Sequence, residues 1–256
     1  FDAHVHTNYS DGVMMHRMVK AAERAGLEKL GLADHCNVLT STSQERSKLV
    51  NGFNLDMTYE RRRKAINIAR KNTDVKLFDA AEVDYEPEDG EVITGFVEEA
   101  GFDYLIGSVH YIDGFNIHVE QPFREKNEEE LYGMVDDYFE KLVSLVESGI
   151  MDVAAHVDLV ERNTKMRGKP STEHYEKVAK AFNKSDAIPE LNAGRSLDGL
   201  GELHPLPEFR EILVTEEIPF TLGTDAHTPE DLLKRVKYFE KQLKDFDGQI
   251  VEPPFN

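Results

Sequence analysis

The stretch Asp2-Ala3-His4-Val5-His6-Thr7 opens the chain as a short β-branched and apolar run that carries two histidines. Six further runs of this kind follow, each separated from the next by a loop and a helical pattern. The predicted strands, counting the opening run, cover residues 1–7, 29–35, 75–85, 103–111, 151–160, 187–193 and 219–227. Strand–helix alternation over this length predicts an α/β fold with a parallel sheet, open or closed.

The segments between these runs show the periodicity of helices, with apolar residues recurring on one face. The predicted helices cover residues 13–25, 58–71, 91–100, 128–148, 172–183, 207–216 and 229–243. Three connections are longer than the usual two to six residues, namely 36–57, 112–127 and 160–171. Because all three follow the carboxyl ends of predicted strands, where α/β folds place their sites, we expect them to contain binding loops.

Composition narrows the classes of partner. The formal charge is −19, from 49 acidic and 30 basic side chains, and such a surface repels nucleic acid and anionic membranes. No apolar run approaches the roughly 18 residues of a membrane span, and the first residues lack the pattern of a signal peptide, so we expect neither feature. The single cysteine, Cys36, excludes an internal disulfide and fits a reducing cytoplasm. We therefore expect a cytoplasmic protein with a small-molecule partner.

The histidines are concentrated at the carboxyl ends of the predicted strands. Two acidic residues, Glu82 and Asp225, occupy equivalent positions. The six histidines are His4, His6, His35, His110, His156 and His227. Imidazole and carboxylate groups that meet at one edge of a sheet suit Zn, Mn or Fe, so the pattern predicts a site for divalent cations.

Spacing within single strands supports this prediction. His4 and His6 lie two residues apart, so a strand directs both rings to one face. Asp225 and His227 have the same spacing on the last predicted strand. Glu82 is the candidate for a carboxylate that bridges cations. Each residue also has a simpler interpretation: a buried histidine is more often a hydrogen-bonded core residue, and Glu82 could be one more solvated acid.

Other residues near the pattern leave alternatives open. Asp11 precedes a predicted helix and could be its N-cap. Cys36 could bind zinc beside His35, although a small packed thiol is the commoner role. The remaining histidines fall within predicted helices or loops and are not predicted to be ligands. They are His16, His118, His174 and His204.

In these motifs the chain resembles the PHP superfamily (polymerase and histidinol phosphatase). The matching segments are 2–7, 10–12, 34–35, Glu82, 107–110, His156 and 223–227. The resemblance implies one distorted TIM-like (β/α)7 barrel over residues 1–256, with a metal site at the carboxyl ends of its strands. It also implies a trinuclear centre and assigns Asp11 as a ligand beside the residues named above.

Within the superfamily the chain looks most like the histidinol-phosphate phosphatases. The segments that carry this closer resemblance are 103–111, 156–160, 190–195, 204–205 and 207–209. It implies hydrolysis of L-histidinol phosphate to L-histidinol and phosphate, a step of histidine biosynthesis, with two or three Zn, Mn or Fe ions. That family commonly has Tyr-Pro where His204-Pro205 stands here, and residues 112–127 match it poorly.

The expected chemistry assigns roles to a few more residues. A water that bridges two cations loses a proton near neutral pH and attacks phosphorus as hydroxide. Arg195 is the first candidate for binding the phosphate and Arg162 the second, because both follow strand ends and a guanidinium matches phosphate oxygens. Ser108 is a further candidate contact with substrate, and Asp225 and His227 lie close enough to take part in catalysis.

Three other interpretations compete with this one. A phosphatase or phosphodiesterase for another small metabolite, such as a nucleotide, would use the same metal cluster. An amidohydrolase also opens with two histidines on a barrel strand, but none of the middle strands predicted here ends in the lysine typical of that family. A non-catalytic metal-binding module would be expected to lack some ligands, whereas every expected position is occupied here. The sequence favours no oligomeric state.

Overall fold

The computed structural model of the protein describes residues 1–38 and 48–254 and contains a seven-stranded parallel sheet. Its strands run in the order β1-β2-β3-β4-β7-β8-β9. Their bounds are β1 Asp2–Val5, β2 Lys29–Cys36, β3 Lys76–Asp84, β4 Tyr104–Ser108, β7 Val153–Ala154, β8 Ile188–Asn192 and β9 Thr221–Gly223. Every neighbouring pair is parallel, as the alternation of strands and helices predicts.

The first and last strands meet and bring the sheet close to a closed barrel. The amide of His6 donates to the carbonyl of Ala226 at 3.0 Å, and the amide of Asp225 donates to the carbonyl of His4 at 2.8 Å. The fold is therefore a distorted TIM-like (β/α)7 barrel, as expected. This closure also places the ends of β1 and β9 side by side, and each of these ends carries predicted ligands.

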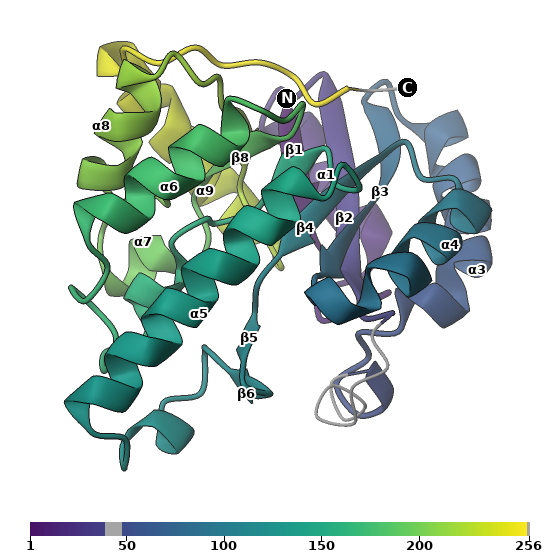
Figure 1. Ribbon diagram of the computed structural model, residues 1–256. Coiled ribbons are helices and arrows are strands. Elements are labelled where there is room, and N and C mark those ends of the chain that lie inside the picture. The colour runs from purple at the N-terminus through teal and green to yellow at the C-terminus, as the bar shows by residue number, and fades with distance from the viewer. Residues whose placement is uncertain (39–47, 255–256) are drawn as a thin grey trace.

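Helices cover the outside of the sheet. They are α1 Met15–Arg24, α3 Leu55–Ala69, α4 Gly90–Ala100, α5 Glu128–Glu147, α6 Thr172–Phe182, α7 Ser196–Gly199, α8 Pro207–Thr215 and α9 Pro229–Gln242. Helices α5, α6 and α8 lie on one side of the strands and α3 and α4 on the other (Figure 1). The N-terminus lies at the end of the sheet opposite the hairpin of β5 (Tyr111–Ile112) and β6 (Phe115–Asn116), which extends from the carboxyl end of β4 (Figure 1).

Several predicted strands are longer than the structure allows. The predicted strand 151–160 holds only β7, after which the chain turns into a 3-10 helix at Leu159–Arg162. The predicted strand 219–227 holds only β9, and 103–111 ends as β4 at Ser108. Residues 112–127, predicted to be a loop, contribute to the short hairpin β5 Tyr111–Ile112 and β6 Phe115–Asn116. Apolar and β-branched residues continue past each strand because the site loops that follow are themselves buried.

The packing leaves the carboxyl ends of the strands free for polar residues. Phe78 and Ala80 lie on the same face of β3 as Glu82, because alternate residues of a strand share a face. They belong to a small buried cluster with Tyr104 and Ile106 of β4. This apolar layer lies beneath Glu82, so the polar residues above it rest on a closely packed part of the core.

None of the helices in the described part of the chain has the length and the apolar composition that a membrane span requires.

A buried arginine ties helix α3 to the strands that carry the site. Arg62 is fully buried, and its Nη1 donates to the Asp34 carboxylate at 2.9 Å and to the Leu32 carbonyl at 2.9 Å. Its Nη2 pairs with Asp79. Asp34 in turn accepts from the amide of Thr7 at 2.6 Å, so the network fixes the segment that follows β1.

We expect the substitution Arg62→Leu to lower the free energy of unfolding by about 3–5 kcal/mol, because it leaves the buried Asp34 carboxylate without its cation and leaves Asp79 with Arg63 alone. Urea unfolding followed by circular dichroism measures this loss. The matched control is Arg61→Leu on the same helix, whose side chain is exposed and should change stability by less than about 0.5 kcal/mol. Equal effects of the two substitutions would contradict the role given to the network.

Candidate metal centre

The barrel brings all nine predicted ligands to the carboxyl ends of its strands. They come from β1 and the segment after it, from β2, β3 and the segments after β4, β7 and β9. The nine are His4, His6, Asp11, His35, Glu82, His110, His156, Asp225 and His227. Their side chains form one continuous cluster, in which each contacts at least one other.

Glu82 lies at the centre of this cluster. Its Oε2 lies 2.7 Å from Nδ1 of His35 and 3.4 Å from Nε2 of His4. The other oxygen, Oε1, lies 3.1 Å from Nε2 of His156 and 3.5 Å from Nε2 of His110. One carboxylate whose two oxygens face different sets of imidazoles has the geometry of a group that bridges cations.

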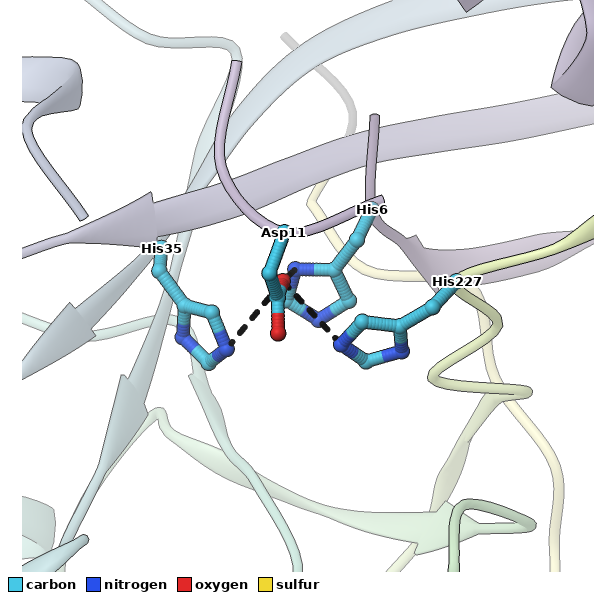
Figure 2. Close-up of side chains that lie close together, drawn as sticks. All are labelled: His6, Asp11, His35 and His227. Carbon is cyan, nitrogen blue, oxygen red and sulfur yellow. Dashed lines mark ion pairs between the residues drawn. The ribbon is translucent and has the colours of Figure 1, made fainter. Parts of the chain in front are cut away.

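A first group of possible ligands gathers around Asp11. The donor atoms of His6, Asp11, His35 and His227 lie within 4.8 Å of one another. Figure 2 shows the Asp11 carboxylate between the rings of His35 and His227, with His6 behind it. Oδ1 of Asp11 lies 3.2 Å from Nε2 of His227 and 3.8 Å from Nε2 of His35. Helix α1 begins only at Met15 and has no side-chain cap, so Asp11 does not cap it.

Two further groups share members with the first. His4, His6 and Asp225 form one, in which Asp225 Oδ1 lies 3.2 Å from Nε2 of His6. His35, Glu82 and His110 form the other. Nε2 of His4 and Nε2 of His6 are 3.1 Å apart, and both face this shared space. Three overlapping groups of nitrogen and oxygen donors fit a cluster of divalent cations, for which such ligands are suited.

Outer residues orient the imidazoles, and the sequence did not reveal them. Glu190 on β8 lies 2.8 Å from Nδ1 of His4, and Asp84 lies 2.6 Å from Nδ1 of His110. Each carboxylate fixes which ring nitrogen faces the cluster, which is a common arrangement around metal-binding histidines. Both acids sit inside predicted strands in an acidic chain, so no sequence signal separates them from surface acids.

A glycine makes room for one of these outer residues. A Cβ built on Gly223 of β9 would overlap the Glu190 carboxylate and lie 2.7 Å from the Cβ of His4. Glu190 can therefore cross beneath β9 to reach His4 only because residue 223 has no side chain.

The backbone is strained at two of the predicted ligands. His156 has a φ of 27° and Asp225 a φ of 51°, both in the left-handed region. Such a conformation costs a non-glycine residue about 1–3 kcal/mol and is concentrated at functional sites. It also explains why the strands end early here, since an extended strand cannot continue through these residues.

Charge balance within the cluster shows how strongly these groups interact. Burial would raise the pKa of Glu82, but the rings of His35, His4 and His110 hold it well below its usual range. Burial lowers the pKa of His6 to about 4, with help from His227 and His35. Burial opposes the charge on His35, yet Glu82 raises its pKa to about 9. Cations that enter the cluster would displace protons shared in this way.

A cavity of about 180 Å³ opens beside the cluster. Arg162 and Arg195, the predicted phosphate contacts, both line it. Two histidines that were not predicted to be ligands, His118 and His204, line it as well. Nδ1 of His118 lies 3.1 Å from Nη1 of Arg162.

Two other predicted candidates have different surroundings. Ser108 is buried and is not among the described residues that line the cavity, and its hydroxyl donates to the Val83 carbonyl at 3.4 Å. The end of β4 turns this hydroxyl back towards β3, and the contact of Ser108 with substrate stays a prediction. Cys36 is fully buried in the main apolar cluster with Leu55 and Val83, which favours the packed thiol over a zinc ligand.

The long connections contribute to the cavity as expected, within the described residues. Asn51 and Phe53 line it from the connection 36–57, of which residues 39–47 lie outside the described part of the chain. Asn116 and Val119 line it from the connection 112–127. The connection 160–171 contributes Arg162.

Comparison with known proteins gives matches over most of the chain. The family described as the PHP domain matches residues 2–194, so Asp225 and His227 lie beyond the matched segment. A protein of Deinococcus radiodurans named probable histidinol-phosphatase is 26% identical over 184 residues, which cover 70% of this chain and 67% of the relative. A Thermotoga maritima protein of the same name is 23% identical over 260 residues, covering 98% and 94%.

Solved structures share the fold. The crystal structure of a putative histidinol phosphatase from Listeria monocytogenes superposes with a TM-score of 0.75 at 20% identity, covering 90% of this chain and 96% of the other. A histidinol phosphate phosphatase from Lactococcus lactis superposes with a TM-score of 0.71 at 18% identity, covering 98% and 95%. The latter structure is a complex with Zn, L-histidinol and phosphate.

Proposed function

We propose that this chain, which belongs to the PHP domain family, hydrolyses L-histidinol phosphate to L-histidinol and phosphate with the help of divalent metal ions. The observation that carries the proposal is the position of Glu82, a buried carboxylate surrounded by imidazoles beside a cavity with two arginines. That arrangement combines sites for cations with sites for an anion, which a phosphatase needs.

The choice of substrate rests on the relatives. Two of them, named probable histidinol-phosphatases, match 70% and 98% of this chain. The Lactococcus lactis protein, which has the same fold, was crystallised with L-histidinol and phosphate. A cavity of about 180 Å³ favours a small phosphomonoester over a macromolecule.

The donor set supports two or three divalent cations in this chain. Three overlapping groups of donors are present, and they consist of nitrogen and carboxylate oxygen throughout, a set that Zn, Mn and Fe all accept. Bound there, such ions would lower the pKa of a water molecule and offset the charge of a phosphate group. All nine cluster residues are the ligands we propose.

The residues of the chain itself then have separate tasks. Asp225 and His227 place a carboxylate and an imidazole at the edge between the cluster and the cavity, where an attacking water would lie. Arg195 and Arg162 enter the cavity from the segments after β8 and β7 and can bind oxygens of the phosphate. The buried floor beneath Glu82 keeps bulk water away from the other side of the cluster.

A second candidate function is the hydrolysis of another small phosphorylated metabolite. It is favoured by the cavity wall formed by Asn116, His118 and Val119, since this segment matches the histidinol-phosphate phosphatases poorly in sequence. The metal cluster would be the same in both cases, so only the alcohol part of the substrate distinguishes them.

The experiment that tests the substrate is a comparison of phosphomonoesters by release of inorganic phosphate from the metal-loaded protein. We expect the highest kcat/KM with L-histidinol phosphate, above sugar phosphates, nucleoside monophosphates and p-nitrophenyl phosphate. A higher kcat/KM with a nucleotide or a sugar phosphate would favour the second candidate. The absence of turnover with every ester would contradict both.

Arg195→Ala should lower kcat/KM by roughly 10- to 150-fold, because a hydrogen bond between charged groups contributes about 1.5–3 kcal/mol. Arg195→Lys should recover only part of this loss, since an ammonium group lacks the planar pair of donors. Steady-state kinetics of phosphate release provide the measurement. A matched control is Arg61→Ala, an exposed arginine on α3, which should leave kcat/KM unchanged.

A further inference from the structure

His204 has an unusual environment for a residue outside the metal cluster. Its side chain is 1% exposed and lines the cavity. Its Nδ1 pairs with the Asp158 carboxylate, whereas its Nε2 has no hydrogen-bond partner among the described residues. A buried nitrogen without a partner is costly, and here it belongs to a ring at the wall of a site.

Asp158 holds the ring in one orientation. It is fully buried, and its second oxygen accepts from the amide of Leu206 at 2.6 Å. The main chain of His204 is fixed as well, because its amide donates to the Asn192 carbonyl at 3.0 Å and its carbonyl accepts from the Asn192 amide at 2.9 Å. With Nδ1 committed to Asp158, the Nε2 edge is the part of the ring left to meet a ligand.

This part of the cavity is suited to an anion. The lining includes Asn192 at the end of β8 and, from the segments after β7 and β8, residues His156, Leu159, Arg162, Arg195 and His204. These parts of the chain contribute no described carboxylate to the lining. The carboxylates of the lining, Asp11, Glu82, Asp84 and Asp225, belong to the metal cluster and its support. A phosphate group between cations and arginines would therefore face His204.

Asp158 determines which ring nitrogen is left for a ligand. Its two oxygens accept from Nδ1–H of His204 and from the amide of Leu206. Nε2 is therefore the ring nitrogen available to the cavity, and a phosphate oxygen that binds there would form its hydrogen bond with this nitrogen.

We propose that His204, oriented by Asp158, binds a phosphate oxygen of the substrate through Nε2 and completes the anion site formed with Arg162 and Arg195. The inference rests on the proposed phosphatase function but not on the identity of the alcohol. His204 is a substrate contact, and Asp158 is a positioning residue that acts through it.

Two substitutions separate this role from a purely structural one. In His204→Asn the amide group can replace Nδ1 and keep the pairing with Asp158, but nothing replaces Nε2. In His204→Gln the amide group can reach the position of Nε2 and donate to phosphate, while the pairing with Asp158 is lost. A contact with phosphate requires the Gln variant to bind phosphate better than the Asn variant, and a structural role requires the Asn variant to be the less damaged of the two.

The test is calorimetric binding of inorganic phosphate to the metal-loaded wild type and variants, with metal content checked by elemental analysis. We expect His204→Asn to raise the Kd for phosphate about tenfold or more, as the loss of a charged hydrogen bond implies, with unchanged metal content. His204→Gln should lie between Asn and wild type. His16→Asn, a change at an exposed histidine of α1, is the control and should bind phosphate like wild type.

An unchanged Kd for phosphate in His204→Asn would overturn the proposal. The same holds if only KM for the ester rises, because the contact would then lie on the alcohol. A Gln variant that binds phosphate more weakly than the Asn variant would also overturn it. Since inorganic phosphate carries no alcohol, these results are independent of whether L-histidinol phosphate is the substrate.

Discussion

Replacement of Glu82 by glutamine should remove nearly all phosphatase activity. The carboxylate lies between imidazoles on both sides, and the amide of glutamine offers one oxygen where two are needed. Changing an outer partner of a metal ligand already costs roughly 10- to 100-fold in affinity or activity. For a bridging ligand we expect the loss in kcat/KM to exceed that range, measured by phosphate release at saturating metal.

The matched control is Glu91→Gln, which makes the same chemical change at an exposed position of α4. It should leave both turnover and metal content at the wild-type level. The Glu82→Gln protein should remain folded by circular dichroism while its metal content falls. Full activity of folded Glu82→Gln would remove Glu82 from the centre of the site.

Removal of divalent ions should have an effect of similar size. Dialysis against a chelator and then against metal-free buffer should abolish turnover, because the described side chains that line the cavity include no group that can replace a metal as Lewis acid, and the two arginines can only donate hydrogen bonds. It should also lower stability, by about 2.7 kcal/mol relative to protein with free metal at 100 times its Kd. Phosphate release and thermal unfolding, recorded on the same samples, measure both effects.

Readdition provides the control for chelation. Zn, Mn or Fe added back one at a time should restore turnover, and the ion that restores most identifies the preferred cofactor. Mg should restore less, because it favours oxygen ligands and keeps its water molecules. Turnover that persists after complete removal of metal would contradict the proposed chemistry for every substrate.

The fold and most of the cluster could be predicted because both depend on local pattern. Alternation of strand and helix sets the parallel sheet, and a period of two places His4 and His6 on one face. Parallel strands then bring residues that are far apart in sequence to one edge, so Glu82 meets His35 through the register of β2 and β3. These are consequences of strand geometry alone.

Other features depend on contacts between distant segments and had no local signal. Glu190 reaches His4 only because Gly223 leaves room. Both residues lie in segments that resemble the family, but no local pattern predicts their contact. The early end of β7 follows from the left-handed backbone of His156, which apolar patterning does not reveal. The sequence places His204 in a loop without any ligand pattern, and its fixed orientation depends on Asp158, which lies 46 residues earlier in the chain.

The outer network links stability to the site. Arg62 pairs with Asp34, and Asp34 holds the amide and hydroxyl of Thr7 and the hydroxyl of Ser10. This segment carries Asp11 into the cluster. A substitution of Arg62 on α3 should therefore loosen Asp11. The packing of this helix thus contributes to the geometry of the proposed metal site.

The most direct test of the central claim is a crystal structure of the metal-loaded protein with phosphate, with anomalous scattering data collected at the metal edges. The account predicts two or three metal peaks among the donor atoms around Glu82 and a phosphate between those peaks and Arg195. An active protein whose crystals show no metal near Glu82, or show it bound by other residues, would contradict the account.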